Sequence, residues 1–317
     1  MNICEKAGKT FGKSHKILSL IIALISTSYR LTLSHLRLTL FLRRGRVIQI
    51  FSERYVTSKP KETKVLVVIT HIVQPWEAKN EESGALKIER LRQTIDGLLS
   101  SLSHCDLKII INTLPNRNVI TFLPSYIKEK ITVRDAKVED SMFAEYYAQD
   151  LLIENKNKFD WFLFIEDDLV IMDSYFLEKI AFFNDHFQVN DILIPNRYEM
   201  CDGVKHYIDI VFDSSNNPVF AWNILSTIDV GGVKFSECAN PHGGMYCLNR
   251  EQLQKWVESG RHWHNKVLSH GPLEWAATFC LFECFNLYKP HSENMHFLEV
   301  LHYDVKYSKA GHSLPIV

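Results

Sequence analysis

Short apolar runs recur along the chain from residue 65 onward, and polar or helical stretches separate them. The runs at 65–70, 107–112 and 161–165 are rich in Val, Ile, Leu and Phe. Nearly continuous apolar runs of this length are typical of strands that are buried on both faces of a sheet. Shorter runs at 131–134 and 191–195 predict two further strands.

The stretches between these runs carry apolar residues at helical spacing. Leu91, Ile95, Leu98 and Leu102 recur every three or four positions, which predicts a helix with one buried face. The same spacing recurs in two later sets: Phe143, Tyr147 and Leu151, and then Phe176, Ile180, Phe183 and Phe187. Strands that alternate with helices predict an α/β fold with a mostly parallel central sheet and flanking helices. In such sheets ligands bind beyond the carboxyl ends of the strands.

Residues 1–50 form a basic and apolar N-terminal arm. They contain nine of the 36 Lys and Arg residues of the chain and one acidic residue, Glu5. An apolar run at 17–25 follows four lysines, and it is short for a membrane-spanning helix, which needs about 20 apolar residues. A leucine-rich segment follows at 31–42. This composition indicates attraction to an anionic membrane surface and not to nucleic acid.

Four interpretations of the arm stay open. We prefer an interfacial anchor on the cytoplasmic face of a membrane, with Lys and Arg at the head groups. The alternatives are a single-pass signal anchor with a luminal catalytic domain, a cleaved signal peptide, and a helical hairpin that packs on the body. The polar stretch at 51–64 is predicted to be a linker to one globular domain at 65–317.

The overall composition sets two limits. With 46% hydrophobic and 23% charged residues, the chain has enough apolar material for one large core. Its seven cysteines are scattered without regular spacing. They provide no disulfide framework and favour reduced thiols, and a single disulfide bridge is the alternative.

Three consecutive acidic residues, Glu166, Asp167 and Asp168, lie between the strand at 161–165 and another apolar run. Burial of an uncompensated charge is costly, so carboxylates in such a place usually have a partner. A divalent cation fits, because Mg²⁺ and Mn²⁺ take oxygen ligands. In an extended or turn conformation Glu166 and Asp168 point to the same side and can approach one ion. A solvated strand end, or an Asp that caps the next helix, is the alternative interpretation.

An aromatic-rich strand that ends in Glu-Asp-Asp-Leu resembles the Asp-x-Asp region of the A-type (GT-A) nucleotide-sugar glycosyltransferases. In that family the motif ends a central strand and holds a metal ion on the donor diphosphate. The resemblance implies that Asp168 and Glu166 bind Mn²⁺ or Mg²⁺, with Asp168 as the direct ligand, and that Asp167 belongs to the donor site. Glu166 departs from the family, which has Asp at the first position of the motif.

Three later landmarks of the family have candidates here in the expected order. Gly243 and Gly244 match a glycine-rich loop beside donor and acceptor, although a tight turn explains the pair equally well. Glu274 matches an acidic residue at the start of a late helix, which implies a catalytic base that deprotonates the acceptor. Trp275 stands where the family has Asp. His302 matches a late histidine that completes the metal shell, and only its place after the other landmarks distinguishes it from a structural histidine.

The base and ribose of the donor are expected at the loops after the first and third strands. This expectation makes His71, Val73 and Asp135 candidate donor-binding residues, on topology alone.

The sequence thus predicts an enzyme of glycan biosynthesis, a metal-assisted glycosyltransferase. It is expected to move a sugar from a nucleotide-sugar donor to a hydroxyl group of a glycan or glycolipid acceptor. The alternative is a membrane-anchored glycan-binding or scaffolding protein without turnover, which the departures at Glu166 and Trp275 keep open. A sugar nucleotidylyltransferase is disfavoured, because no Gly-x-Gly-x-x-x-Arg-like loop follows the strand at 65–70.

Overall fold

The computed structural model describes residues 63–138, 140–212, 218–220, 226–238, 241–260 and 271–316. All of them belong to one compact unit, which extends from Lys59 to Val317. The predicted arm at 1–50 and nearly all of the linker at 51–64 lie outside the described residues. Within the described ranges, every helix is too short or too polar to cross a membrane.

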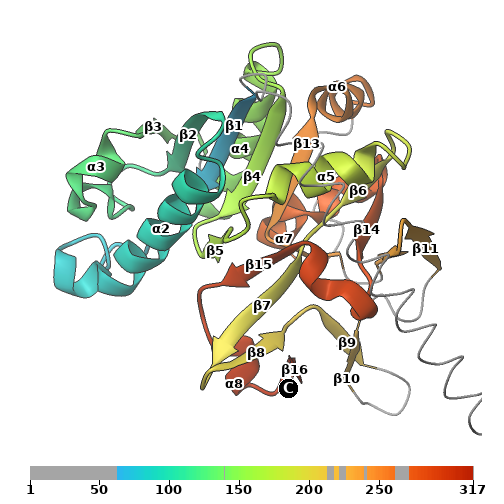
Figure 1. The fold of residues 1–317 in the computed structure, drawn as a ribbon. Helices are drawn as coiled ribbons and strands as arrows, with labels where there is room; N and C mark the ends of the chain where they lie inside the picture. Colours follow the sequence, from blue (N-terminus) through green and yellow to red (C-terminus); the bar gives the residue numbers. More distant parts are fainter. Residues whose placement is uncertain are drawn as a thin grey trace, which may run out of the picture. The chain divides into compact units, whose positions relative to one another are not determined.

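A five-stranded sheet contains the first strands of the unit, in the order β13-β4-β1-β2-β3 (Figure 1). Four of these strands are parallel and β13 is antiparallel to β4. The strands are β1 (Lys64–Thr70), β2 (Asp106–Thr113), β3 (Ile131–Asp135), β4 (Trp161–Glu166) and β13 (Met245–Asn249). The mostly parallel central sheet predicted from the apolar runs is therefore confirmed, with one strand, β13, running in the opposite direction.

Helices follow the strands as the apolar spacing predicts. The longest helix of the described residues is α2 (Glu81–Ser101), whose N-cap Asn80 accepts a hydrogen bond from the backbone N–H of Ser83. Helix α4 (Ala144–Glu154) packs on β1, β2 and β4 of the central sheet. The other helices are α3 (Ser125–Lys128), α5 (Phe176–Asn184), α6 (Arg250–Glu258), α7 (Pro272–Ala277) and α8 (Lys306–Lys309). Short 3-10 turns are η1 (Ile120–Phe122), η2 (Ser141–Phe143), η3 (Phe279–Glu283) and η4 (Ser292–Phe297).

The second half of the unit is built, in its described residues, from three further sheets that the apolar pattern did not predict. One has the order β16-β8-β7-β15-β5, a second the order β11-β12-β14-β6, and β9 pairs with β10. Their strands are β5 (Leu169–Val170), β6 (Asp191–Leu193), β7 (Asn196–Cys201), β8 (Val204–Tyr207), β9 (Ile210–Phe212), β10 (Pro218–Phe220), β11 (Thr227–Val230), β12 (Val233–Glu237), β14 (Asn286–Pro290), β15 (Glu299–His302) and β16 (Leu314–Ile316). The strand expected at 191–195 exists as β6, but it belongs to one of these sheets and not to the central one.

The chain crosses from the central sheet to the second five-stranded sheet directly after β4. Strand β4 ends at Glu166, and β5 begins at Leu169 and pairs with β15. In this pairing Leu169 lies opposite His302, and the backbone N–H of Tyr303 donates to the carbonyl of Asp168 at 2.7 Å. The acidic residues therefore lie at the junction of two sheets, next to a histidine from the far end of the chain.

Candidate functional site

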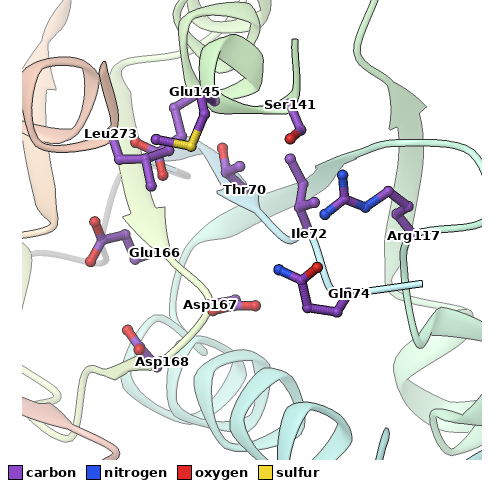
Figure 2. Close-up of a pocket in the computed structure, with 11 residues that line it drawn as sticks. Thr70, Ile72, Gln74, Arg117, Ser141, Glu145, Glu166, Asp167, Asp168 and Leu273 are labelled. Carbon is purple, nitrogen blue, oxygen red and sulfur yellow. The ribbon is translucent and has the colours of Figure 1, made fainter. Parts of the chain in front are cut away.

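A cavity of about 250 Å³ lies beyond the carboxyl ends of β1 and β4 (Figure 2). Such a position agrees with the general rule for parallel sheets. The lining residues are Thr70, Ile72, Gln74, Arg117, Ser141, Met142, Glu145, Glu166, Asp167, Asp168 and Leu273. Four of the lining side chains are carboxyl groups, and Arg117 is the cationic one. All three acidic residues singled out in the sequence thus line one cavity.

The three acidic side chains at the end of β4 alternate in direction. Figure 2 shows Glu166 and Asp168 on one side of the chain and Asp167 on the other, as expected for extended backbone. Asp167 Oδ2 lies 2.5 Å from Nδ1 of His71. The Asp167 carbonyl accepts a hydrogen bond from Thr94 Oγ1 at 3.0 Å. Asp167 is thus anchored to α2 and to the loop after β1, and this anchoring fixes the direction of its two neighbours.

Asp168 faces the imidazole ring of His302. The Nε2 atom of His302 lies 3.6 Å from Asp168 Oδ2. The other ring nitrogen, Nδ1, lies 2.9 Å from Oε1 of Glu199, a buried residue of β7. Glu199 also accepts hydrogen bonds from the backbone N–H groups of Tyr307 and Ser308. The ring orientation of His302 is therefore fixed by Glu199, and its second nitrogen is presented to Asp168.

The charges around Asp168 keep it ionised. Burial raises the pKa of this carboxyl group, but the interaction with His302 and the nearby Arg90 outweigh burial and lower its pKa. Burial lowers the pKa of His302, yet the attraction of Asp168 raises it above the usual value. Arg90, on α2, lies 4.0 Å from Asp168 Oδ2 and forms an ion pair with Asp304 at 2.5 Å. One oxygen of Asp168, Oδ1, is buried and has no hydrogen-bond partner in the described part of the chain.

Glu166 is supported by the glycine pair that precedes β13. Its backbone N–H donates to the Gly244 carbonyl at 3.0 Å. Gly244 has φ +58, and a Cβ atom there would collide with Oε2 of Glu166. A Cβ on Gly243 would lie 2.6 Å from Ile194 Cγ2. Gly243 and Gly244 do not line the cavity, so their observed role is to leave room for Glu166 and for core packing. Burial and the charge of Asp168 raise the pKa of Glu166 to about 7.

Glu145 is a lining residue that the sequence did not reveal. It lies on the first turn of α4, its residue is 7% exposed, and its Oε2 has no hydrogen-bond partner within the described ranges. Burial, followed by the negative charges of Glu166, Asp167 and Glu274, raises its pKa well above the usual value. A carboxyl group in the first helical turn usually interacts with the helix dipole at the surface. The available signal was the buried helix face that Glu145 shares with Gln149 and Leu152.

Glu274, the predicted base, lies on the first turn of α7 and is partly exposed. Its neighbour Leu273 lines the cavity, whereas Glu274 itself is not among the lining residues. Gly271, with φ +97, precedes the helix, and a Cβ there would lie 3.0 Å from Glu274 Oε2. Glu274 is thus adjacent to the cavity and within electrostatic range of Glu145.

The candidate donor-binding residues from the loops are placed differently from the expectation. His71 and Val73 are 0% and 1% exposed and belong to the core. The backbone N–H and carbonyl of Val73 are both bound to Arg117. The alternate residues Ile72 and Gln74 line the cavity instead. Asp135 is exposed at the end of β3 and does not line the cavity. The loop after β1 lines the cavity, but through Ile72 and Gln74 and not through the predicted His71 and Val73.

The predicted metal trio is only partly assembled. Among the described residues, no three His, Cys, Asp or Glu side chains form a group that could hold a metal ion. Asp168 and His302 are neighbours, and Glu166 lies on the same side of the chain as Asp168 (Figure 2). The structure therefore brings together one carboxylate, Asp168, and one imidazole, His302, with the carboxyl group of Glu166 nearby.

Comparison with known proteins finds distant structural similarity and no match in sequence. No protein-family model matches the chain, and no curated protein matches it in sequence. Among solved structures, GalNAc-T7 with UDP, GalNAc and Mn²⁺ matches with a TM-score of 0.46 and 12% identity, over 77% of this chain and 44% of that chain.

Two smaller proteins match with a TM-score of 0.36. One is a 4-diphosphocytidyl-2C-methyl-D-erythritol synthase from Anaerococcus prevotii DSM 20548, with 12% identity over 74% of this chain and 92% of that chain. The other is described as a nucleotide-diphospho-sugar transferase from Desulfovibrio desulfuricans G20, with 8% identity over 75% of this chain and 80% of that chain. Likenesses at this level carry no functional inference, so the function has to be inferred from the site residues.

Proposed function

We propose that the protein is a glycosyltransferase that moves a sugar from a nucleotide-diphosphate sugar to a hydroxyl group of an acceptor, assisted by Mn²⁺ or Mg²⁺. One observation carries the proposal: Asp168 and His302 face each other beside a cavity at the end of a central strand. Asp168 has a buried oxygen without a partner in the described part of the chain. Glu199 hydrogen-bonds Nδ1 of His302, the ring nitrogen that does not face Asp168.

The residues present fit a divalent cation. Carboxylate and imidazole are ligand types that Mn²⁺ accepts, and a carboxylate behind the histidine is the usual support of such a ligand. Asp168 and His302 would hold the ion, with Glu166 on the same side of the chain as a further carboxyl group. A bound cation would offset the negative charge that develops on the leaving nucleotide diphosphate.

The opposite side of the cavity carries donors for a nucleotide. Figure 2 shows Arg117 and Gln74 across the cavity from Glu166. Arg117 is fixed by the hydrogen bond from its Nε atom to the Val73 carbonyl at 2.9 Å. A guanidinium group and an amide can bind phosphate oxygens or the polar edge of a base. We assign Arg117 and Gln74 to the nucleotide in place of His71, Val73 and Asp135.

Glu274 remains the proposed base. A base must come within hydrogen-bond reach of the hydroxyl group that it deprotonates, and Glu274 follows the lining residue Leu273 on α7. The proposed acceptor is a glycan or glycolipid hydroxyl group. Contact of the arm at 1–50 with a membrane surface is part of the same proposal and comes from the sequence.

The first experiment is a panel of nucleotide sugars tested by thermal shift, with and without Mn²⁺, on the wild type and on Asp168→Asn. A ligand at 100 times its Kd should add about 2.7 kcal/mol to the free energy of unfolding. We expect stabilisation by one class of donor that requires Mn²⁺ and is lost in Asp168→Asn. Asp106→Asn, an exposed residue at the amino end of β2, is the matched control and should behave as the wild type.

The same donor then separates an enzyme from a binding protein. Mn²⁺-dependent release of the nucleoside diphosphate from that donor supports the transferase. Binding without release supports the non-catalytic glycan-binding alternative. No response of the folded wild type to any donor would overturn the donor site itself.

A further inference from the structure

Glu145 is a buried group at the site that the proposed reaction does not use. It lines the cavity from the first turn of α4, and its residue is 7% exposed. Its Oε2 atom is buried without a hydrogen-bond partner in the described ranges. Buried polar atoms in native proteins nearly always have a partner, so an orphaned one in the wall of a cavity points to a ligand.

The surroundings of Glu145 are acidic and apolar. Helices α4 and α7 pack against each other, and Leu273 of α7 lines the same cavity as Met142 and Glu145. Figure 2 shows Leu273 and Glu145 at the end of the cavity that is remote from Gln74 and Arg117. The cavity thus has a cationic end, which suits phosphate oxygens, and an end with carboxyl and apolar groups.

The acidic end favours a neutral ligand group. The Glu145 carboxyl group has at least one oxygen that can accept a hydrogen bond, and its buried Oε2 atom has no partner in the described ranges. A hydroxyl group of a sugar can donate to such an oxygen, whereas a ligand carboxylate can accept but not donate.

We propose that Glu145 hydrogen-bonds a hydroxyl group of an uncharged sugar in this cavity and thereby selects neutral sugars over acidic ones. The inference rests on the proposed transferase function and names the class of sugar that is moved. Leu273 and Met142 supply the apolar contact for the C–H face of the sugar ring. Arg117 and Gln74 bind the nucleotide part at the other end.

The test measures how much the sugar adds to binding. Calorimetry in the presence of Mn²⁺ compares UDP with UDP-glucose and UDP-glucuronate, and GDP with GDP-mannose and GDP-mannuronate. The proteins are the wild type, Glu145→Gln and Glu145→Leu. Glu154→Gln is the control, because Glu154 is an exposed residue at the end of the same helix.

We expect the wild type to bind a neutral nucleotide sugar at least about tenfold more tightly than its uronate partner. Glu145→Leu should weaken the neutral sugar roughly tenfold, the loss of one hydrogen bond, and leave the nucleoside diphosphate unchanged. Glu145→Gln keeps an accepting oxygen and should stay within about threefold of the wild type. Glu154→Gln should match the wild type.

Two results would overturn the inference while the donor site stands. One is a wild type that binds the uronate as tightly as the neutral sugar, a comparison that needs no variant. The other is a folded Glu145→Leu with unchanged affinity for the neutral sugar. If the wild type binds neither nucleoside diphosphates nor nucleotide sugars, the proposed function fails, and this inference fails with it.

Discussion

His302 shows how one buried carboxylate can prepare a ligand. Glu199 accepts from His302 Nδ1, from the backbone N–H groups of Tyr307 and Ser308, and from the Ser308 hydroxyl. Burial raises the pKa of Glu199, but these hydrogen bonds outweigh it and lower the pKa. The carboxylate therefore stays charged and fixes the ring, and the remaining nitrogen faces Asp168.

Glu199→Gln should weaken Mn²⁺ binding by about 10- to 100-fold, the usual effect of removing the support behind a ligating histidine. The amide keeps one accepting oxygen, while its NH₂ group cannot accept from His302 or Ser308. Titration of the protein with Mn²⁺ by calorimetry measures the change. Glu237→Gln, an exposed residue at the end of β12, is the control. Unchanged Mn²⁺ affinity in a folded Glu199→Gln would contradict the role of Glu199.

The loop after β1 shows what residue types cannot reveal. His71 is the residue with obvious chemistry, yet it is fully buried between Asp167 and the backbone N–H of Val119. Ile72 and Gln74 reach the cavity. Successive side chains of an extended segment alternate in direction, and the register of the loop against the neighbouring segments decides which set lines the cavity.

At the scale of elements, the junction of β4 and β5 places the acidic residues. A buried parallel strand ends at Glu166, and after two intervening residues the chain pairs with β15 in another sheet. The turn between them is held by Gly244, whose carbonyl accepts from Glu166 and whose lack of a Cβ leaves space for the Glu166 side chain. The glycine pair thus contributes to the site without lining the cavity, because it leaves space for Glu166 and for core packing.

Gly244→Ala should lower the free energy of unfolding by about 2 kcal/mol or more. A positive φ is unfavourable for Ala, and its Cβ atom would collide with Glu166. The substitution should also reduce stabilisation by donor and Mn²⁺, because Glu166 has to move. Urea unfolding with and without these ligands measures both effects.

Gly203→Ala is the matched control for this prediction. Gly203 has φ +77, and a Cβ there meets nothing within 4 Å. The free energy of unfolding of Gly203→Ala should fall by about 1 kcal/mol, from the backbone conformation alone, and stabilisation by donor and Mn²⁺ should stay unchanged. Equal behaviour of the two variants would show that the space beside Glu166 does not matter.

At the scale of the whole described unit, a buried ion cluster joins two sheets. Asp209 is fully buried and binds Arg197 of β7 and Lys289 of β14, each within 3.0 Å. Lys289 also donates to the carbonyl of His242, next to the glycine pair. Burial raises the pKa of Asp209, but the two cations outweigh it and lower the pKa. One carboxylate thus compensates two buried positive charges.

Asp209→Asn should cost about 3–5 kcal/mol of the free energy of unfolding, because both cations lose their buried counter-charge. Asp229→Asn, at an exposed position of β11, should change the free energy of unfolding by less than about 0.5 kcal/mol. Urea unfolding of the two variants tests this. A small effect of Asp209→Asn would mean that water reaches the cluster and compensates the charges.

The sequence by itself determined the central sheet and the place of the acidic residues. Apolar runs and helical spacing are local properties, so β1 to β4, α2 and α4 could be predicted from them. The apolar run of β4 identified it as a buried strand. The three acidic residues that follow it were therefore expected at the carboxyl end of the sheet. The same local reasoning put Glu166 and Asp168 on one side of the chain and Asp167 on the other.

Only the tertiary structure decided which residues from distant segments meet there. Strand β5 has two residues, and β7 and β15 bury polar residues such as Asn196, Glu199 and His302, so no apolar period indicated these strands or their pairing. That pairing sets His302 beside Asp168 and Glu199 behind it. Glu145 lines the cavity because α4 packs on β1, β2 and β4, and Arg117 lines it because the loop after β2 is hydrogen-bonded to Val73. Contacts between distant segments depend on packing and register, which local patterns do not specify.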